Sequence, residues 1–269
     1  SRLDTLAKAC QCRVIAVSSL SGKGIDSLIE AIAEAAKTDR PTITGNLVSP
    51  GDTVVLVMPQ DPQAPRGRLI LPQVQTLREL LDKGCTAICT SPDRLSSTLA
   101  SLTQSPSLVI TDSQVFGAVA AAVSPDIPLT SFSVLMAGYK GDIDLFVRGA
   151  EAITSLGSGS RVLIAEACSH KPMAEDIGRV KIPRLLHKLA GDGISIDITG
   201  GSDFPADLTP YDLVIHCGGC MFTRRHVLTR VSRAEAAGVP VTNYGIFLAT
   251  VAGIMPRVVW PSTSRPNIN

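Results

Sequence analysis

The sequence predicts an α/β protein with two successive domains, each built on a mainly parallel sheet flanked by helices. Short continuous apolar runs recur along the chain, and residues 54–58 and 161–165 are clear examples. Runs of this length are typical of strands buried on both faces, and they alternate with longer segments whose apolar residues follow helical spacing. This alternation indicates a covered parallel sheet. With 269 residues, 45% of them hydrophobic, the chain is long enough to bury two cores.

The first forty residues are expected to form one strand, one turn and one helix. Residues 13–19 predict a strand, a turn with two glycines follows, and Asp26 is placed to cap a helix whose apolar residues have helical spacing. A single strand needs a sheet to join. We therefore interpret residues 1–40 as the last part of a separate domain.

Residues 41–137 are expected to form the first sheet domain. A linker with proline and glycine, residues 39–46, leads into it. The predicted strands are residues 54–58, 87–89, 108–110 and 129–137, and the predicted helices are residues 73–82, 93–102 and 113–122.

Residues 138–269 are expected to form the second sheet domain. The predicted helices are residues 142–153, 182–189 and 223–236, and the predicted strands are residues 161–165, 194–198, 213–215 and 239–242, with an apolar segment at residues 246–254. No internal sequence repeat is evident.

Cysteine and histidine residues follow two predicted strands of the second domain. Cys168 and His170 come after one strand, and His216, Cys217 and Cys220 come at the end of another. In open parallel sheets, ligands bind beyond the carboxyl ends of the strands, where both groups are placed. Thiolates and imidazoles suit zinc or iron-sulfur clusters, whereas calcium and magnesium prefer oxygen. The residue types therefore predict a thiolate-rich metal site.

Three cysteines are the expected ligands of this site. A turn that enters a helix can direct Cys217 and Cys220 at one cluster, and Cys168 supplies the third sulfur. His170 and His216 have an alternative role. Each could donate a hydrogen bond to a metal ligand and not bind the metal itself. The candidates for a fourth ligand are His170, His216, an oxygen of Glu175 or Asp176, and an exchangeable ligand from outside the protein.

Two other kinds of site use the same residues. A structural zinc ion could be held by Cys168, His170, Cys217 and Cys220, which is the usual ligand number for zinc. A thiol-disulfide oxidoreductase is the second alternative, because Cys-x-x-Cys between a strand and a helix is an arrangement that lowers a thiol pKa.

Composition restricts the cellular setting and the partners. The net charge is +1, so nothing in the charge balance indicates nucleic acid. No apolar run approaches the length that spans a membrane, and residues 1–4 lack the start of a signal segment. The chain has seven cysteines, an odd number in a long chain, which favours thiol or metal chemistry over a disulfide framework. We expect a cytoplasmic protein.

Several separated blocks resemble one family. They are Glu166-Ala167-Cys168-Ser169-His170, the segment from Asp176 to Arg184, and His216-Cys217-Gly218-Gly219-Cys220-Met221. In order and in kind they resemble the FeFe-hydrogenase maturation scaffold and GTPase family, HydF. Residues 67–75 and 242–245 are similar too. The gap of 45 residues between the two ligand groups is slightly shorter than is usual in that family.

The resemblance implies a domain organisation. Residues 1–40 would be the end of a GTPase domain, with Ser18, Ser19 and Leu20 matching the triplet beside the guanine base, and Ser19 departing from the usual alanine. Residues 41–137 would be the dimerisation domain and residues 138–269 the cluster-binding domain. The sequence has no Gly-x-x-x-x-Gly-Lys-Ser/Thr loop for phosphates, so GTP binding and hydrolysis are expected only of a full-length family member.

The resemblance also implies cofactors and partners. Family members bind a 4Fe-4S cluster through three cysteines, receive a two-iron precursor that carries CO and cyanide, and pass it to the apo-FeFe-hydrogenase. The implied partners are a second copy of the chain, the hydrogenase and radical-SAM maturases. A precursor with negative charge would meet complementary charge near the ligands. The basic residues expected to bind it are Lys171, Arg179, Lys181, Arg184 and Arg224, followed by Arg225.

Overall fold

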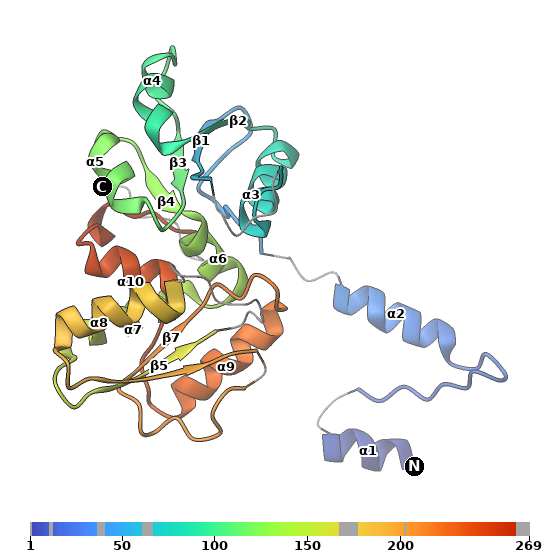
Figure 1. Ribbon diagram of the computed structural model, residues 1–269. Helices are drawn as coiled ribbons and strands as arrows, with labels where there is room; N and C mark the ends of the chain where they lie inside the picture. Colours follow the sequence, from blue (N-terminus) through green and yellow to red (C-terminus); the bar gives the residue numbers. More distant parts are fainter. Residues whose placement is uncertain are drawn as a thin grey trace. The chain divides into compact units, whose positions relative to one another are not determined.

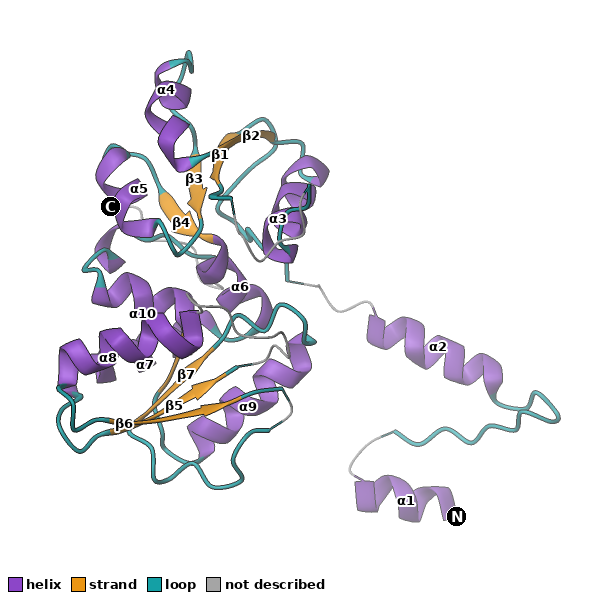
Figure 2. Cartoon of the chain, viewed as in Figure 1, coloured by secondary structure: helices purple, strands orange, loops and turns teal. Residues whose placement is uncertain are grey.

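Two parallel four-stranded sheets with flanking helices form most of the protein, which confirms the predicted fold class. The first sheet has the strand order β2-β1-β3-β4, and the second has the order β6-β5-β7-β8. Figure 1 traces the chain from one sheet to the other, and Figure 2 shows helices on the faces of the second sheet.

The computed structural model describes residues 2–10, 13–36, 41–60, 67–166, 177–201 and 203–261. Contacts between residues divide the chain into two units, residues 1–41 and residues 42–269. Both sheets belong to the second unit. Where helices are described, none is both long enough and apolar enough to cross a membrane.

The first unit has two helices, α1 (Arg2–Cys10) and α2 (Ile25–Ala36). The helix predicted after Asp26 is confirmed, but the strand predicted at residues 13–19 is wrong. Residues 13–18 have an irregular backbone, and the described part of the first unit contains no strand. A lone strand leaves its backbone groups without partners and is not stable in water. Ser18 lies in a turn in which its backbone N–H donates to the Lys23 carbonyl, and Leu20 is exposed.

The first sheet alternates strands with helices in chain order. Its elements are β1 (Thr53–Val57), α3 (Leu71–Asp82), β2 (Thr86–Thr90), α4 (Leu95–Ala100), β3 (Leu108–Thr111), α5 (Phe116–Ala122), β4 (Leu129–Ser131) and α6 (Phe132–Lys140). β1 and β3 are buried almost throughout, as continuous apolar runs predict. The backbone N–H of Val259 donates to the Leu129 carbonyl and covers the β4 edge, so β2 is the edge with no described neighbour.

One predicted element of this sheet is wrong. Residues 129–137 were expected to form a single strand, but the strand stops at Ser131 and α6 begins at Phe132. The Ser131 hydroxyl accepts a hydrogen bond from the Val134 backbone N–H and caps the helix. A continuous apolar run fits a buried strand and a buried helix equally well, so spacing alone could not locate this boundary.

The second sheet repeats the alternation. Its elements are α7 (Ile143–Ala150), β5 (Arg161–Ala165), α8 (Ile182–Ala190), β6 (Ser195–Thr199), β7 (Leu213–His216), α9 (Arg224–Ala236), β8 (Val241–Asn243) and α10 (Tyr244–Val251). A π-helical turn, Ile177–Lys181, leads into α8. The short 3-10 helices are Pro92–Arg94, Glu151–Ser155 and Met255–Arg257. The predicted strands and helices of this domain are confirmed to within a few residues, and the apolar segment at residues 246–254 belongs mainly to α10.

The two sheets are copies of one arrangement. Both have the same strand order, and matching backbone bonds recur: Asp112 N–H donates to the Val57 carbonyl in the first, and Cys217 N–H donates to the Ala165 carbonyl in the second. The stretches that enter the last helix of each copy are also similar, Pro-Leu-Thr-Ser-Phe-Ser-Val-Leu-Met-Ala at residues 128–137 and Pro-Val-Thr-Asn-Tyr-Gly-Ile-Phe-Leu-Ala at residues 240–249. The repeat is therefore one of fold, although no repeat is evident along the sequence as a whole.

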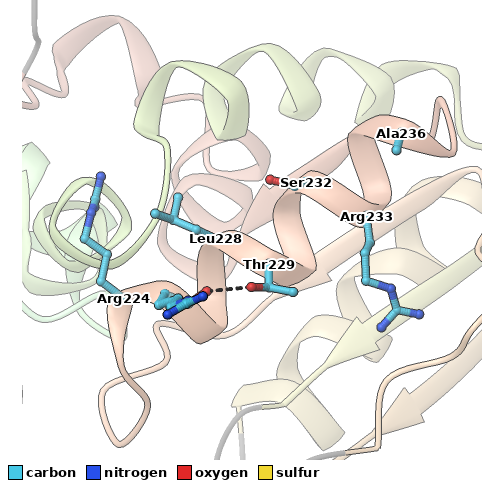
Figure 3. A pocket seen from close by; sticks show the side chains of 7 residues that line it. Arg224, Leu228, Thr229, Ser232, Arg233 and Ala236 are labelled. Atoms are coloured by element: carbon cyan, nitrogen blue, oxygen red, sulfur yellow. Dashed lines mark hydrogen bonds between the residues drawn. The ribbon is translucent and has the colours of Figure 1, made fainter. Parts of the chain in front are cut away.

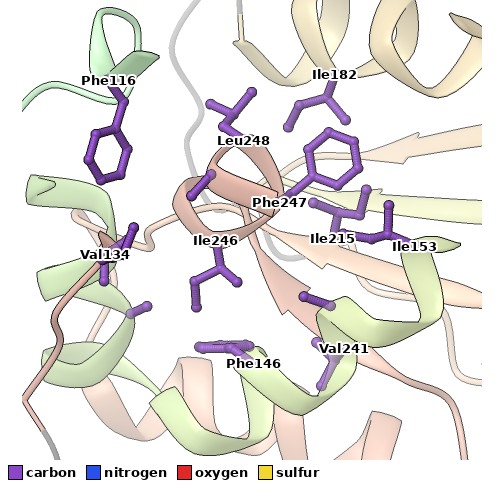
Figure 4. Packing of buried hydrophobic residues seen from close by; sticks show 14 of the residues in the cluster. Phe116, Val134, Phe146, Ile153, Ile182, Ile215, Val241, Ile246, Phe247 and Leu248 are labelled. Carbon is purple, nitrogen blue, oxygen red and sulfur yellow. The ribbon is translucent and has the colours of Figure 1, made fainter. Parts of the chain in front are cut away.

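α10 lies at the centre of the larger core. It is apolar on all sides, and its residues Ile246, Phe247 and Leu248 are buried. Figure 4 shows these side chains leaving the helix in different directions, with Phe116 of the first sheet's helices on one side and Ile182 of α8 on another. A helix of this kind is stable only when it is surrounded by protein, so α10 joins the two copies.

A partly exposed ion pair gives a testable pH dependence. Asp197 on β6 accepts hydrogen bonds from the Tyr211 hydroxyl at 2.9 Å and from Arg161 Nε at 2.9 Å. These two partners lower the pKa of Asp197 below its ordinary value of 3.8. Because the pKa is lowered on folding, the pair stabilises the protein above pH 3.8, and this stabilisation is lost as the pH falls through the folded-state pKa.

We expect Asp197→Asn to lower the free energy of unfolding at pH 6 by less than about 1 kcal/mol, because solvent screens an exposed pair. The difference between the variant and the wild type should shrink as the pH falls below 3.8. Urea unfolding of both proteins at several pH values measures it, and a difference that does not change with pH would contradict the assignment.

Candidate metal centre

Three of the predicted ligands, His216, Cys217 and Cys220, lie at or just after the end of β7, where the chain order of the second sheet reverses. β5 has β6 on one side and β7 on the other, and Ala165 pairs with His216 at the carboxyl ends of β5 and β7. In open parallel sheets this switch in strand order is the position at which α/β proteins commonly bind ligands. Glu166 and Cys217 directly follow the strands. The segment of residues 167–176, with Cys168, His170, Lys171, Glu175 and Asp176, lies outside the described residues.

The loop after β7 holds the Cys217 sulfur close to the backbone. Cys217 is 7% exposed, and its Sγ accepts a hydrogen bond from the Gly219 backbone N–H at 3.4 Å. Gly219 has a φ of 59°, and a Cβ there would lie 2.7 Å from Val227 Cγ2 of α9. Both the backbone conformation and the close approach require glycine. Cys220 is partly buried in the same loop.

His216 is a buried neutral imidazole beside this loop. Its side chain is 1% exposed, and Nδ1 lies 2.6 Å from the Cys217 carbonyl oxygen. Burial lowers the pKa of His216 to about 4. The ring is therefore uncharged at neutral pH, and the hydrogen-bond network assigns its proton to Nδ1, which donates to the carbonyl. Nε2 has no hydrogen-bond partner among the described residues. A neutral imidazole in this tautomer can bind a metal ion through Nε2.

Glu166 and Arg179 flank the undescribed segment. The Glu166 carboxylate accepts hydrogen bonds from Arg179 Nε at 3.0 Å and from Nη2 at 2.9 Å, which is a two-pronged ion pair. Gly178 leaves room for this contact, because a Cβ there would lie 2.2 Å from Tyr244 Oη and 2.8 Å from Glu166 Oε1. Arg179 was expected to bind a precursor. The structure gives its guanidinium a carboxylate partner within the protein.

Comparison with known families assigns both sheet domains. The model of the "Hydrogen maturase F dimerization domain" matches residues 43–141, and the model of the "Hydrogen maturase F tetramerization domain" matches residues 144–261. The chain belongs to the HydF family. It accordingly has a role in hydrogenase maturation, and it carries the family's domains for self-association. Neither match includes Ser18, Ser19 and Leu20.

Other comparisons add nothing to the HydF assignment. No curated protein matches the chain. Similar solved structures include an ABC transporter solute-binding protein from Burkholderia multivorans, 14% identical and covering 79% of each chain, with a TM-score of 0.25. A 5,10-methylenetetrahydrofolate dehydrogenase from the silkworm Bombyx mori is also 14% identical, covers 86% of this chain and 91% of its own, and has a TM-score of 0.25. At such TM-scores neither structure supports an argument.

The other described basic residues that were expected to bind a precursor do not form one cluster in this HydF chain. Arg224 Nη1 donates to the carbonyls of Gly138, Tyr139 and Gly141 at 2.8 to 2.9 Å, so Arg224 caps the carboxyl end of α6. Lys181 Nζ lies 3.4 Å from the Gln114 carbonyl oxygen. Arg184 and Arg225 are exposed. Figure 3 shows Arg224 at one end of an open groove on α9, where Leu228 and Thr229 also lie.

Sequence reasoning missed one basic residue at this site, Arg230 of α9. It is 3% exposed and lies on the buried face of the helix with Val227 and Val231. The sequence does indicate that Arg230 is buried, because residues 227, 230, 231 and 234 have the spacing of a helix face that packs on a sheet. A charged residue in such a stripe indicates a buried partner.

The residue types at this site of the HydF chain suit a thiolate-bound metal, but the described residues do not make a complete ligand group. Two cysteines and a neutral histidine with an unpartnered buried nitrogen lie at the end of β7 and in the loop after it. Within the described ranges, no three His, Cys, Asp or Glu side chains form a group that could hold a metal ion. The third predicted thiol, Cys168, is outside those ranges.

Proposed function

We propose that this HydF-family chain is a cytoplasmic scaffold for hydrogenase maturation. It holds a 4Fe-4S cluster on Cys168, Cys217 and Cys220, receives a two-iron precursor with CO and cyanide ligands, and passes the precursor to the apo-FeFe-hydrogenase. Radical-SAM maturases would supply the precursor. In this proposal residues 138–269 bind the cluster and residues 41–137 contribute the dimer contact.

The observation that carries the proposal is the loop from His216 to Cys220 at the carboxyl end of β7, beside β5. This loop offers two sulfurs and one neutral imidazole at the place where α/β proteins bind ligands. The glycines between the cysteines leave backbone N–H groups free of side chains, and such groups donate hydrogen bonds to sulfur. Gly219 already donates to Cys217 Sγ in this way.

The protein's own residues would determine how the cluster exchanges its outer ligand. When bound, a 4Fe-4S cluster with three thiolate ligands offers one iron to a further ligand. His216 can occupy that position through Nε2 or remain a hydrogen-bond partner, because its Nδ1–H is already donated to the Cys217 carbonyl. A neutral nitrogen binds less firmly than a thiolate, so an incoming ligand could displace it. His170, Glu175, Asp176 and an outside ligand remain alternatives for the same position.

The thiol-disulfide alternative receives less support from the local structure. In that chemistry a helix begins at the Cys-x-x-Cys motif, and its amino end lowers the thiol pKa. Here α9 begins at Arg224, after the Thr223 cap, so both cysteines precede the helix by several residues. Structural zinc remains the alternative that needs an experiment.

Anaerobic reconstitution with iron and sulfide, followed by metal and sulfide analysis, tests the proposal. We expect iron and sulfide in equal amounts, little zinc, and a magnetic spectrum that changes when imidazole or cyanide is added, without loss of iron. Cys85→Ser is a matched control, because Cys85 is a buried cysteine of the first sheet whose Sγ contacts the Ser49 carbonyl at 3.3 Å. That variant should bind the same amount of iron.

Two results would contradict the proposal. Tightly bound zinc without sulfide in the metal analysis would indicate a structural zinc site. A full cluster whose spectrum is indifferent to every added ligand would mean that no iron is open to the precursor.

A further inference from the structure

Arg230 is a buried cation that has no carboxylate partner among the described residues. Its Nη2 donates to the Gly201 carbonyl, and its guanidinium lies 4.9 Å from the Phe204 ring centre and 5.6 Å from that of Phe222. Its Nη1 is buried and has no hydrogen-bond partner within the described ranges. Two aromatic faces and one carbonyl hold the group in place, and no carboxylate of the described residues compensates its charge.

Arg230 lies against the cysteine loop, because its guanidinium is 5.6 Å from the ring centre of Phe222, two residues after Cys220. Burial lowers the pKa of Arg230, and the negative charge of Cys217 acts in the opposite direction. Val227, one turn earlier on α9, contacts the loop at Gly219, so this part of the helix lies directly against the cysteine loop. The other charged or titratable groups that face Arg230 are His216, which is neutral, and Arg233.

The first sheet provides an internal comparison. Its residue at the position of Cys217 is Asp112, and Gln114 N–H donates to Asp112 Oδ1 as Gly219 N–H donates to Cys217 Sγ. The helix that follows in the first copy, α5, is Phe-Gly-Ala-Val-Ala-Ala-Ala and has no charged residue. The helix α5 of the first copy therefore has no counterpart of Arg230.

We propose that Arg230 compensates the negative charge of the Cys217 and Cys220 thiolates and of the anionic iron-sulfur group that they hold. The inference rests on the proposed function for the identity of that group. Burying a guanidinium without an anion is unfavourable, because it loses its hydration. A thiolate-bound cluster placed beside it would restore the balance of charge, and Arg230 would act as a positioning residue for the cluster.

Three variants test the role of this charge. Arg230→Gln removes the charge, and Arg230→Lys keeps it but loses the flat group between the two rings. Arg233→Gln is the matched control, since Arg233 also lies over Phe204, at 5.1 Å, and donates to the Pro205 and Ala206 carbonyls. Circular dichroism and thermal unfolding show which variants fold.

For reconstituted protein, we expect Arg230→Gln to release iron to a chelator roughly 10- to 100-fold faster than the wild type. Loss of a residue that supports metal ligands commonly has an effect of this size. The cluster that remains should have a more negative reduction potential, because a nearby positive charge favours the reduced, more negative cluster. Arg230→Lys should lie close to the wild type in potential, and Arg233→Gln should match it in both measurements. The proposal would be overturned if Arg230→Gln had the same reduction potential and the same rate of iron release as the wild type. It would also be overturned if Arg230→Gln and Arg230→Lys changed these two quantities equally.

A second measurement separates this inference from the proposed function. If wild-type protein forms no 4Fe-4S cluster, the proposed function fails, and Co²⁺ titration of the metal-free protein then tests Arg230 alone. The thiolate-to-cobalt absorption should require roughly 10- to 100-fold more Co²⁺ in Arg230→Gln than in wild type. Unchanged Co²⁺ affinity would show that Arg230 does not serve the thiolates.

Discussion

Cys217→Ser and Cys220→Ser are each expected to abolish stable binding of iron and sulfide, and we expect the same of Cys168→Ser. A cluster left with two protein thiolates loses chelation and also loses a negative ligand that iron requires. A serine hydroxyl is nearly the same shape but is a poor ligand because it stays protonated at neutral pH. Iron and sulfide analysis after anaerobic reconstitution gives the result directly.

Controls distinguish loss of a ligand from loss of the fold. Cys85→Ser changes a buried cysteine in the other sheet, so it should retain the cluster even if it unfolds more readily. His170→Ala and His216→Ala should keep the cluster while changing its spectrum or its exchange with added imidazole. Near-normal iron and sulfide in any one cysteine variant would remove that cysteine from the proposed ligand set.

Gly149→Ala is expected to lower the free energy of unfolding by about 3 kcal/mol, at the upper end of what overpacking causes. Gly149 lies where α7 contacts the β8 backbone, and a Cβ there would be 2.0 Å from the Val241 carbonyl oxygen and 2.9 Å from its nitrogen. Neither element can move aside easily. β8 is paired with β7, and the Thr242 hydroxyl donates to the Phe146 carbonyl of α7 at 2.9 Å.

Gly117→Ala provides the comparison for this variant. Gly117 is an exposed residue of α5, and a Cβ there would have no atom within 4 Å. Alanine should leave stability unchanged or raise it by up to about 1 kcal/mol, because it restricts the unfolded chain. Urea unfolding of the three proteins measures both effects. Similar midpoints for Gly149→Ala and Gly117→Ala would contradict the close contact between α7 and β8.

The inner strands of both sheets, β1, β3, β5 and β7, could be predicted because they are buried on both faces. Residues 108–110 and 213–215 are uninterrupted apolar runs of strand length, and helical stripes separate them from the next strand. The failures have physical causes. At residues 129–137 strand and helix share one apolar run, and at residues 13–19 the pattern indicated a strand although no described strand is present to pair with it.

The site could be predicted in its ligand types but not in its charges. Cys217 and Cys220 stand out in sequence because thiols at this spacing after a strand suit few kinds of chemistry. The partners of Arg179 and Arg224 depend on contacts between distant segments, and sequence spacing carries no information about them. Arg230 could have been noticed within the buried stripe of α9, but its position beside the cysteine loop becomes apparent only from the fold.

The matching sheets have an implication for the origin of this chain. Two halves with the same strand order, the same backbone bonds at the ends of the strands and a similar entry into the last helix have the pattern that duplication of an ancestral gene segment leaves. After such a duplication the two halves can diverge separately. The loop after β7 carries sulfur at Cys217 where the loop after β3 carries a carboxylate at Asp112, so the ends of corresponding strands can take different chemistry while both halves keep one architecture.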